Sequence, residues 1–383
     1  MVSTDQITRL SEQMTFEPDG ELPLAKPPVC TIASPKPAGV IYSAAAGNQR
    51  VKLLKTLLSS VCERDCYYCP FRSGRDFHRE TLKPDELSAA FISMHRANAV
   101  EGLFLSSGIA AGGMKTQDRL IDAAELLRNK YQFRGYLHLK IMPGAERDQV
   151  LRAMQLADRI SINLEAPNEI RLANLAPHKV FWDELLAPLR WAEEIRQSLP
   201  SHQGWSGYWP SLTTQFVVGA VGESDLELLS ASKYLFNQLR LSRIYYSAFS
   251  PVLDTPLENH SPENPVRQLR LYQASFLLRD YGFDLEDFPF NTSGNLPLSD
   301  DPKRAWAQQN LIVQPLEVNR AERWQLLRVP GIGPKSADAL INARRKGPIR
   351  QIEDLQRLGI AWQKAAPYIL LEGRKPSYQP SLW

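Results

Sequence analysis

The sequence is poor in cysteine and contains no long apolar run. Only four of its 383 residues are cysteines, and three of these lie within eight positions, which does not suit the disulfide framework of a small secreted protein. No stretch of about 18 apolar residues occurs, so a transmembrane helix is excluded. The first 15 residues lack the apolar core of a secretory signal. We therefore expect a cytoplasmic protein with reduced thiols and no membrane partner.

The sequence has little net charge, but that charge is unevenly distributed. The whole chain carries +3, whereas residues 320–375 hold twelve basic and five acidic residues, a net charge of +7 that leaves −4 for the rest. A basic segment on a mildly acidic body predicts that the segment contacts a polyanion. The length allows one large domain and one small domain.

Three of the four cysteines, Cys62, Cys66 and Cys69, follow the spacing C-x3-C-x2-C. Thiolates at this spacing can hold three irons of an iron–sulfur cube and leave the fourth iron open to a ligand. A structural zinc site completed by His78, or a loop of free thiols, are the alternatives. The remaining cysteine, Cys30, is expected to be an inert side chain or else a reactive thiol near the site. Since only this one cysteine remains outside the motif, the chain has too few cysteines to ligate a second cluster.

From about residue 39, apolar runs alternate with amphipathic segments. The pattern predicts six strand–helix units, which implies a parallel sheet with right-handed crossovers. Six such units can curve into a partial (β/α)6 barrel, whose site would lie at the carboxyl ends of the strands. The predicted strands are 53–58, 102–106, 135–142, 159–165, 213–219 and 243–249, and the predicted helices are 84–97, 116–130, 146–157, 180–197, 224–239 and 266–281.

Several of these strands are predicted to end in polar or glycine-rich segments. Any one of them alone is more often a turn or a helix cap. Together with the cysteine loop they indicate a functional mouth at one edge of the sheet. The segments are Ser106-Ser107-Gly108, His138-Leu139-Lys140, Asn163-Leu164-Glu165 and Gly219 to Glu223.

The basic segment is predicted to form two helical hairpins. In the first, Asn319 caps a helix that runs to residue 327, and a turn at Gly331-Ile332-Gly333 leads to a second helix. A weaker copy turns at 358–360 and continues as a helix over 361–370.

Backbone N–H groups at such turns can bind phosphate groups. With Lys335 and Ser336 beside the first turn, this pattern predicts binding to the backbone phosphates of a nucleic acid without recognition of its bases. A packing hairpin or a protein-docking module is the alternative.

Two further groups of residues admit two interpretations each. An aromatic group before the fifth predicted strand could stack bases or cover the end of the barrel; it comprises Trp205, Tyr208 and Trp209. An arginine group behind the cysteine loop could line a phosphate path or be solvated surface; it comprises Arg72, Arg75 and Arg79.

The cysteine spacing and the strand ends resemble the radical S-adenosylmethionine superfamily. Its hallmark is C-x3-C-x2-C after the first strand of a partial barrel, with an aromatic residue before the last cysteine, here Tyr68. The resemblance implies a [4Fe–4S] cluster on Cys62, Cys66 and Cys69. It also implies that S-adenosylmethionine binds the open iron and is cleaved by one electron to a 5′-deoxyadenosyl radical, with a donor such as flavodoxin or ferredoxin.

The resemblance also implies which residues contact S-adenosylmethionine. Ser106-Ser107-Gly108 stands where the superfamily usually has Gly-Gly-Glu, so the chain departs from the pattern there. The implied contacts are Tyr68, Ser106, Ser107, Gly108, Lys140, Asn163, Glu165, Gly219, Glu223 and Phe249.

Four segments resemble one subgroup more closely, that of DNA modification or repair radical S-adenosylmethionine proteins, which end in a helix-hairpin-helix and accompany a uracil-DNA glycosylase-like partner. These segments are 104–108, 138–140, 245–248 and 301–307. The resemblance implies an α/β fold, a partial (β/α)6 barrel followed by a small all-α tandem helix-hairpin-helix domain. The expected divisions are an arm 1–38, a barrel 39–290, a connector 291–318, a DNA-binding domain 319–375 with Gly331, Ile332, Gly333, Lys335 and Ser336, and a tail 376–383.

The expected function is therefore a radical enzyme that cleaves S-adenosylmethionine and repairs or modifies DNA. One alternative is that the substrate is RNA or a protein bound to nucleic acid. The other is a non-catalytic DNA-binding protein with a structural metal site, although polar strand ends are of no use to such a scaffold.

Overall fold

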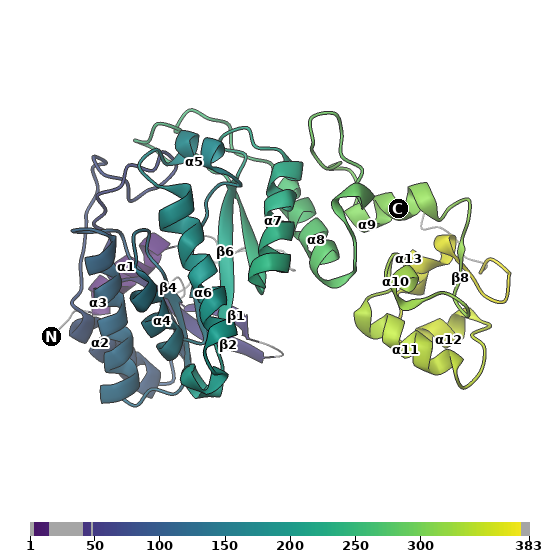
Figure 1. The fold of residues 1–383 in the computed structure, drawn as a ribbon, viewed down its shortest axis with the longest axis horizontal. Coiled ribbons are helices and arrows are strands. Elements are labelled where there is room, and N and C mark those ends of the chain that lie inside the picture. Colours follow the sequence, from purple (N-terminus) through teal and green to yellow (C-terminus); the bar gives the residue numbers. More distant parts are fainter. Residues whose placement is uncertain (1–3, 15–40, 47–48, 377–383) are drawn as a thin grey trace, which may run out of the picture. The chain divides into compact units, whose positions relative to one another are not determined.

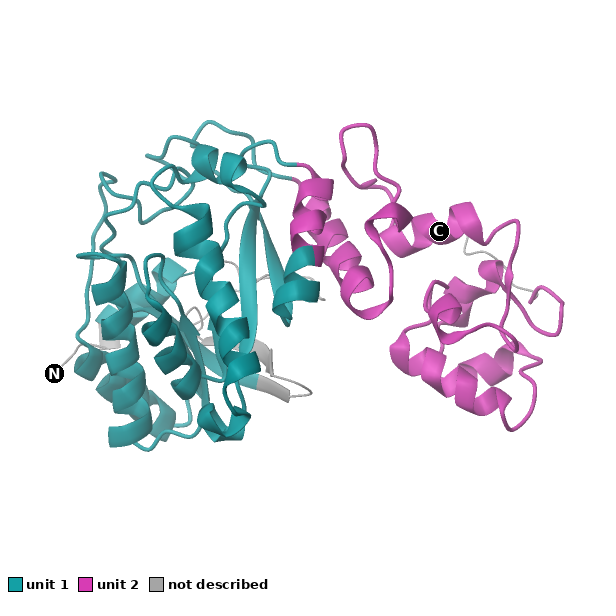
Figure 2. Cartoon of the chain, viewed as in Figure 1, with its two compact units in different colours: residues 1–223, 234–263 teal, residues 224–233, 264–383 magenta. Residues whose placement is uncertain are grey.

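The computed structural model describes residues 4–14, 41–46 and 49–376. The chain divides into two compact units (Figure 2). Unit 1 comprises Met1–Glu223 and Tyr234–Glu263, and unit 2 comprises Ser224–Lys233 and Asn264–Trp383. The domain boundaries expected from the sequence stay a prediction. Cys30, most of the expected arm and nearly all of the expected tail lie outside the described residues.

The strands of unit 1 form one seven-stranded sheet whose order follows the chain. The first two strands are antiparallel, and each later strand pairs in parallel with the one before it. The result is a curled parallel half-barrel of six strands, β2 to β7, which confirms the predicted α/β fold (Figure 1). The strands are β1 (Ile41–Ala46), β2 (Gln49–Leu57), β3 (Gly102–Ser106), β4 (Tyr136–Lys140), β5 (Arg159–Ser161), β6 (Ser211–Val218) and β7 (Arg243–Ala248).

The inner strands are buried on both faces of the sheet, although β4 carries the polar side chains His138 and Lys140 on one of these faces. Every residue of β3 is buried, and so is all of β4 after its first residue. This is the pattern of a parallel sheet covered by helices. Neighbouring helices α2 (Pro84–Arg96), α3 (Gly113–Glu125), α4 (Arg147–Leu156) and α6 (Ala187–Ser198) pack against one another along the sheet (Figure 1).

Unit 1 also contains elements that the sequence did not predict. β1 adds an antiparallel edge to the sheet, and α5 (Glu169–Leu175) is capped by Asn168, whose side chain accepts the Arg171 N–H. The predicted helices over 116–130 and 180–197 each include a π-helical segment, η2 (Leu126–Lys130) and η3 (Phe181–Leu186). The short N-terminal helix is α1 (Thr4–Gln13).

The predicted strand over 159–165 is wrong in its second half. β5 ends at Ser161 because the Thr214 hydroxyl group takes over the next hydrogen bonds: it donates to the Ile162 carbonyl (2.6 Å) and accepts the Leu164 N–H (3.1 Å). Pairing resumes at one residue, where Glu165 bridges Phe216. The interruption acts as a bulge, a feature that redirects a side chain.

Unit 2 consists mainly of helices. Besides the start of α7 (Asp225–Leu239), they are α8 (Pro265–Asp280), α9 (Pro302–Asn310), α10 (Arg323–Leu326), α11 (Pro334–Arg344), α12 (Ile352–Arg357) and α13 (Trp362–Ala365). Two short strands, β8 (Leu316–Glu317) and β9 (Ile369–Leu370), pair in parallel. No helix among the described residues is long and apolar enough to cross a membrane.

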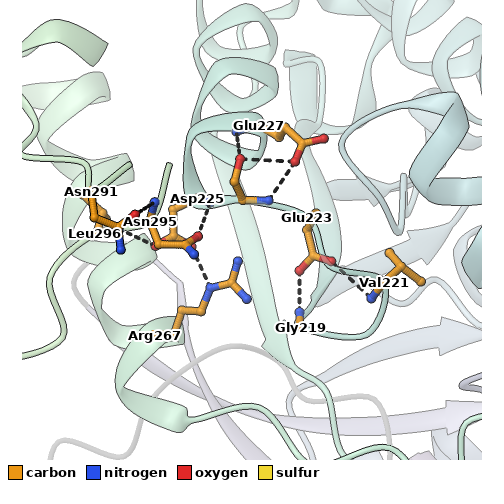
Figure 3. A network of polar contacts seen from close by, with 10 residues as sticks. Gly219, Val221, Glu223, Asp225, Glu227, Arg267, Asn291, Asn295 and Leu296 are labelled. Carbon is orange, nitrogen blue, oxygen red and sulfur yellow. Dashed lines mark hydrogen bonds and ion pairs between the residues drawn. The ribbon is translucent and has the colours of Figure 1, made fainter. Parts of the chain in front are cut away.

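A buried carboxylate organises the first part of unit 2 (Figure 3). Asp225 is fully buried, and its two oxygens accept hydrogen bonds from Arg267 Nε (2.7 Å) and the Leu296 N–H (2.8 Å). Its own N–H donates to Asn295 Oδ1 (3.1 Å). Asp225 thus connects the start of α7, helix α8 and the loop that follows α8.

The last four helices share one apolar core. Among its members are Leu326, Ile332, Leu340, Leu355 and Ile360, from both predicted hairpins. Each predicted turn contains a glycine with positive φ, Gly331 at 83° and Gly359 at 69°.

Two details of the predicted hairpins are wrong. Helix α10 begins after Glu322, not after Asn319, because the Asn319 side chain bonds to both backbone groups of Ile349. The last predicted helix is shorter than 361–370. It is α13, then the 3-10 turn η7 (Ala366–Tyr368) that contains Pro367, and then β9.

Candidate active site and basic hairpins

Unit 1 contains a cavity of about 610 Å³ at the carboxyl ends of its parallel strands. The three clustered cysteines line it, together with residues from the five other parallel strands, β3 to β7, or from the segments that directly follow them. The predicted site residues in its lining are Cys62, Cys66, Tyr68, Cys69, Ser106, Ser107, Gly108, Lys140, Asn163, Glu165 and Phe249. The topology thus gathers side chains that are up to 187 positions apart in the sequence.

Backbone contacts hold the cysteine loop in place. The Glu63 N–H donates to the Ile109 carbonyl (2.8 Å), and the Tyr67 N–H donates to the Leu175 carbonyl (2.9 Å). The Phe71 N–H points at Cys69 Sγ (3.4 Å). An N–H group aimed at a sulfur stabilises a thiolate and is one means by which a protein tunes a cluster.

Arg79 and Arg75 hold this loop from behind. Arg79 donates to the carbonyls of Ser60, Phe71, Arg72 and Arg75 at 2.8 to 3.2 Å. Arg75 donates to the Pro70 and Leu253 carbonyls, both at 2.9 Å. The guanidinium groups of both residues are therefore engaged with the protein backbone, and Arg75 also lines the cavity, so the phosphate path stays a prediction.

The end of β3 comes very close to the cysteine loop at Gly108. Its N–H donates to the Ser59 carbonyl (2.6 Å), and a Cβ atom there would lie 2.3 Å from the Val61 carbonyl oxygen. Only glycine permits this approach. Ser106 and Ser107 are buried beside it in the cavity lining.

Glu165 enters the cavity from the bulge after β5. Its φ of 64° is unusual for a residue with a side chain and costs about 1–3 kcal/mol. Oε1 accepts from Lys179 Nζ at 2.9 Å, and these side chains are 6% and 9% exposed. Oε2 is buried and has no hydrogen-bond partner among the described residues.

Burial and charge act together on the ionisable groups of the cavity. Burial raises the pKa of Cys66, and the Lys179 charge is the next influence and lowers it. Burial likewise raises the pKa of Cys69, and burial followed by the Glu165 charge raises that of Tyr68. For Lys179, burial lowers the pKa, but the charges of Cys66 and Glu165 outweigh it and raise the pKa overall. Metal binding would displace the thiol protons.

Among the predicted strand-end residues, Gly219, Glu223 and His138 lie outside the cavity lining. Glu223 accepts hydrogen bonds from the N–H groups of Gly219 and Val221, so it closes its own turn (Figure 3). His138 Nε2 lies 2.9 Å from Ser161 Oγ, and its ring stacks on Phe104. Burial, and then the charges of Arg159, Lys140 and Lys55, lower the pKa of His138 well below its usual value.

The aromatic residues before β6 lie at the amino end of that strand, opposite the cysteine loop. Trp205 stacks against Arg128 at 3.8 Å from the ring centre, and the Trp209 indole N–H donates to the Leu199 carbonyl. Both contacts favour the interpretation in which these rings cover the end of the barrel. Tyr208 is 76% exposed.

His78, the candidate fourth ligand of a zinc site, is exposed and contacts Glu80 at 3.0 Å. Across the described part of the chain, no three His, Cys, Asp or Glu side chains group as ligands of a single metal ion.

Some cavity residues were missed from the sequence. Gln215 on β6 and Ser247 on β7 form a hydrogen bond with each other (3.1 Å) within the lining. Both are polar residues inside predicted strands, and the sequence therefore offered a signal for them. No sequence signal pointed to Lys179, because it follows helix α5, which was not predicted from the sequence.

The predicted phosphate-binding residues lie together in unit 2. Gly331 packs against the second hairpin, where a Cβ atom would lie 2.5 Å from the Ala361 carbonyl oxygen and 3.1 Å from Lys364 Cβ. Ile332 is buried in the core, and Gly333 is the N-cap residue of α11. Lys335 is exposed and Ser336 is half-buried, both in the first turn of α11.

Residues 56–201 match the model of the Radical SAM superfamily. The match covers 146 of the 383 residues, and the enzymes of that superfamily use a [4Fe–4S] cluster, S-adenosylmethionine and an electron donor. A search of curated proteins finds no match to this chain.

The fold is similar to that of several solved structures. The maturase HydG from Carboxydothermus hydrogenoformans is 16% identical, with a TM-score of 0.47 over 59% of this chain and 51% of its own. Methylornithine synthase (PylB) is 14% identical, with a TM-score of 0.47 over 60% of this chain and 62% of its own. The chain thus spans about half the length of HydG and less than two thirds of PylB.

The cavity residues fit this cofactor set. Three thiols on one short loop can ligate three irons and leave one open. The unpartnered Oε2 of Glu165 can accept a hydrogen bond from a ligand in the cavity. Cys62, Cys66 and Cys69 would hold the cluster, and the other strand ends would line the space beside it.

Proposed function

We propose that this chain is a radical S-adenosylmethionine enzyme that acts on DNA. Its cofactors would supply a carbon-centred radical able to remove a hydrogen atom from a substrate. The observation that carries the proposal is the cavity in unit 1, where three cysteines meet polar residues of the five other parallel strands. Cys62, Cys66 and Cys69 bind the cluster, and Ser106, Ser107, Gly108, Lys140, Asn163 and Glu165 contact S-adenosylmethionine.

The basic hairpins support DNA as the substrate. We infer that unit 2 contains a tandem helix-hairpin-helix whose two glycine turns bind backbone phosphates. Lys335 and Lys364, one from each hairpin, are exposed and form no ion pair within the described residues. Binding through a few phosphates is weak, salt-dependent and independent of sequence, so unit 2 would hold the DNA without selecting a base.

The proposal includes further partners. A flavodoxin or ferredoxin would reduce the cluster, and a uracil-DNA glycosylase-like protein would act with the enzyme on the same DNA. A base in a duplex must leave the stack before it can enter a cavity at the end of a barrel. The reaction is accordingly a repair or a modification of an unstacked base.

The decisive measurement is 5′-deoxyadenosine formation by the reconstituted, reduced full chain under anaerobic conditions, with and without duplex DNA. We expect product from wild type, more product with duplex DNA, and none from Cys66→Ser. Lack of product from a protein with an intact cluster would contradict radical chemistry. A response to RNA and not to duplex DNA would contradict the proposed substrate alone.

The substrate base can be sought in cells. We expect a nucleoside to accumulate or disappear in genomic DNA when the gene is deleted, and the same nucleoside to change when the glycosylase-like partner is deleted. Mass spectrometry of hydrolysed DNA from both strains and the wild type measures this. Identical nucleoside profiles would argue against a role in DNA modification.

A further inference from the structure

One stretch of unit 1, residues 175–184, lies along the cysteine loop and contacts it at three points. The Tyr67 N–H donates to the Leu175 carbonyl (2.9 Å), Arg64 forms an ion pair with Glu184 (2.6 Å), and Asp65 lies 2.8 Å from His178 Nδ1. The Arg64 guanidinium also donates to the His178 carbonyl. This stretch therefore has a fixed position relative to the loop that carries the cysteines.

Lys179 lies in the middle of this stretch and lines the cavity. Its side chain is 9% exposed, and its ammonium group donates to Glu165 Oε1 at 2.9 Å. A lysine is rarely buried so deeply without a partner of opposite charge. Because Glu165 also lines the cavity, the pair brings one buried cation and one buried carboxylate to the cavity that Cys66 lines.

The Lys179–Glu165 pair lines the same cavity as Cys66 and Cys69, so both charges would act on a cluster held there. Reduction of a cluster adds one negative charge, so a nearby buried cation favours the reduced form and a nearby anion disfavours it.

We propose that the buried ammonium group of Lys179 raises the reduction potential of the cluster. Glu165 holds that ammonium group in place and partly offsets the effect of its charge. The inference relies on the cluster in the proposed function and not on DNA. It assigns a task to a residue outside the cysteine motif, on a segment that the cysteine loop itself holds in position.

The test compares three full-chain variants, each reconstituted with iron and sulfide and measured without S-adenosylmethionine. Lys179→Met removes the charge and keeps much of the side-chain volume, Lys179→Arg keeps the charge, and Glu165→Gln removes the opposing charge. Iron and sulfide contents confirm that each variant carries the cluster. The readout is the midpoint potential from an EPR-monitored redox titration.

We expect Lys179→Met to disfavour the reduced cluster at least tenfold, which is about 59 mV towards more negative potential for one electron. Lys179→Arg should remain near wild type, and Glu165→Gln should shift the potential in the positive direction. Opposite shifts for the two charge-removing variants cannot come from a general loosening of the loop.

A wild-type potential in Lys179→Met would overturn the inference. If Lys179→Met fails to hold iron, Glu165→Gln still decides, because an unchanged potential in that variant would also overturn it. Failure of the wild-type chain to assemble a cluster would instead contradict the proposed function.

Discussion

Cationic side chains lie beside both candidate sites, but their contacts differ between the two. Behind the cysteine loop, the guanidinium group of Arg79 is spread over four backbone carbonyls and that of Arg75 over two. At the hairpins of unit 2, Lys335 and Lys364 project from the surface. The first set holds the protein together, and the second is available to a ligand.

The difference follows from the chemistry of the side chains. A guanidinium group has five N–H donors in a fixed plane, so one arginine can satisfy several carbonyls of an irregular loop. An ammonium group on a flexible stem is strongly hydrated and suits a mobile phosphate contact. A cluster of arginines in a sequence is therefore no sign of an anion site until their partners are known.

The largest effect is expected from Arg79→Ala. Loss of its four hydrogen bonds should lower the free energy of unfolding by about 2–4 kcal/mol and reduce the iron bound after reconstitution, because the loop loses its support. Denaturant unfolding and iron analysis measure both. Lys115→Ala, at an exposed lysine of α3, is the control and should behave as wild type. Equal stability of the two variants would contradict the role of Arg79 in holding the loop.

An intermediate effect is expected from Gly331→Ala. The positive φ alone costs about 1–3 kcal/mol, and the new Cβ would also meet the Ala361 carbonyl oxygen at 2.5 Å. Gly359→Ala is a matched control, since its φ is also positive but no atom lies within 4 Å of the added Cβ. Thermal unfolding should place Gly331→Ala below Gly359→Ala, and the reverse order would show that the two hairpins do not pack as described.

The smallest effect on stability is expected from Lys335→Ala and Lys364→Ala. Each should leave the unfolding free energy unchanged, weaken binding to duplex DNA of any sequence, and reduce the slope of log affinity against log salt by about 1. Fluorescence anisotropy over a salt series measures this, with Lys115→Ala as the control. If both variants bind DNA as wild type does, the hairpins are not the phosphate-binding surface.

Much of the fold could be predicted from the sequence because its signals are local. Alternating apolar and amphipathic segments indicate parallel strands and covering helices, and Pro84 marks the start of α2. The edge strand β1 and helix α5 escaped prediction because their sequences are short and only weakly periodic. Asn319 was also predicted wrongly from local sequence alone. Its side chain is suited to cap a helix, but in the structure it bonds to the backbone of Ile349.

The candidate site divides in the same way. The sequence by itself determined the cysteine spacing, the polar composition of the strand ends and the basic glycine turns, because each is formed by residues close together in the chain. Only the tertiary structure decided that Arg75 and Arg79 hold the loop, that Glu223 closes its own turn, and that Lys179 reaches Glu165. Those roles depend on partners brought together by folding, and the free energy of a buried charge is set by the groups around it.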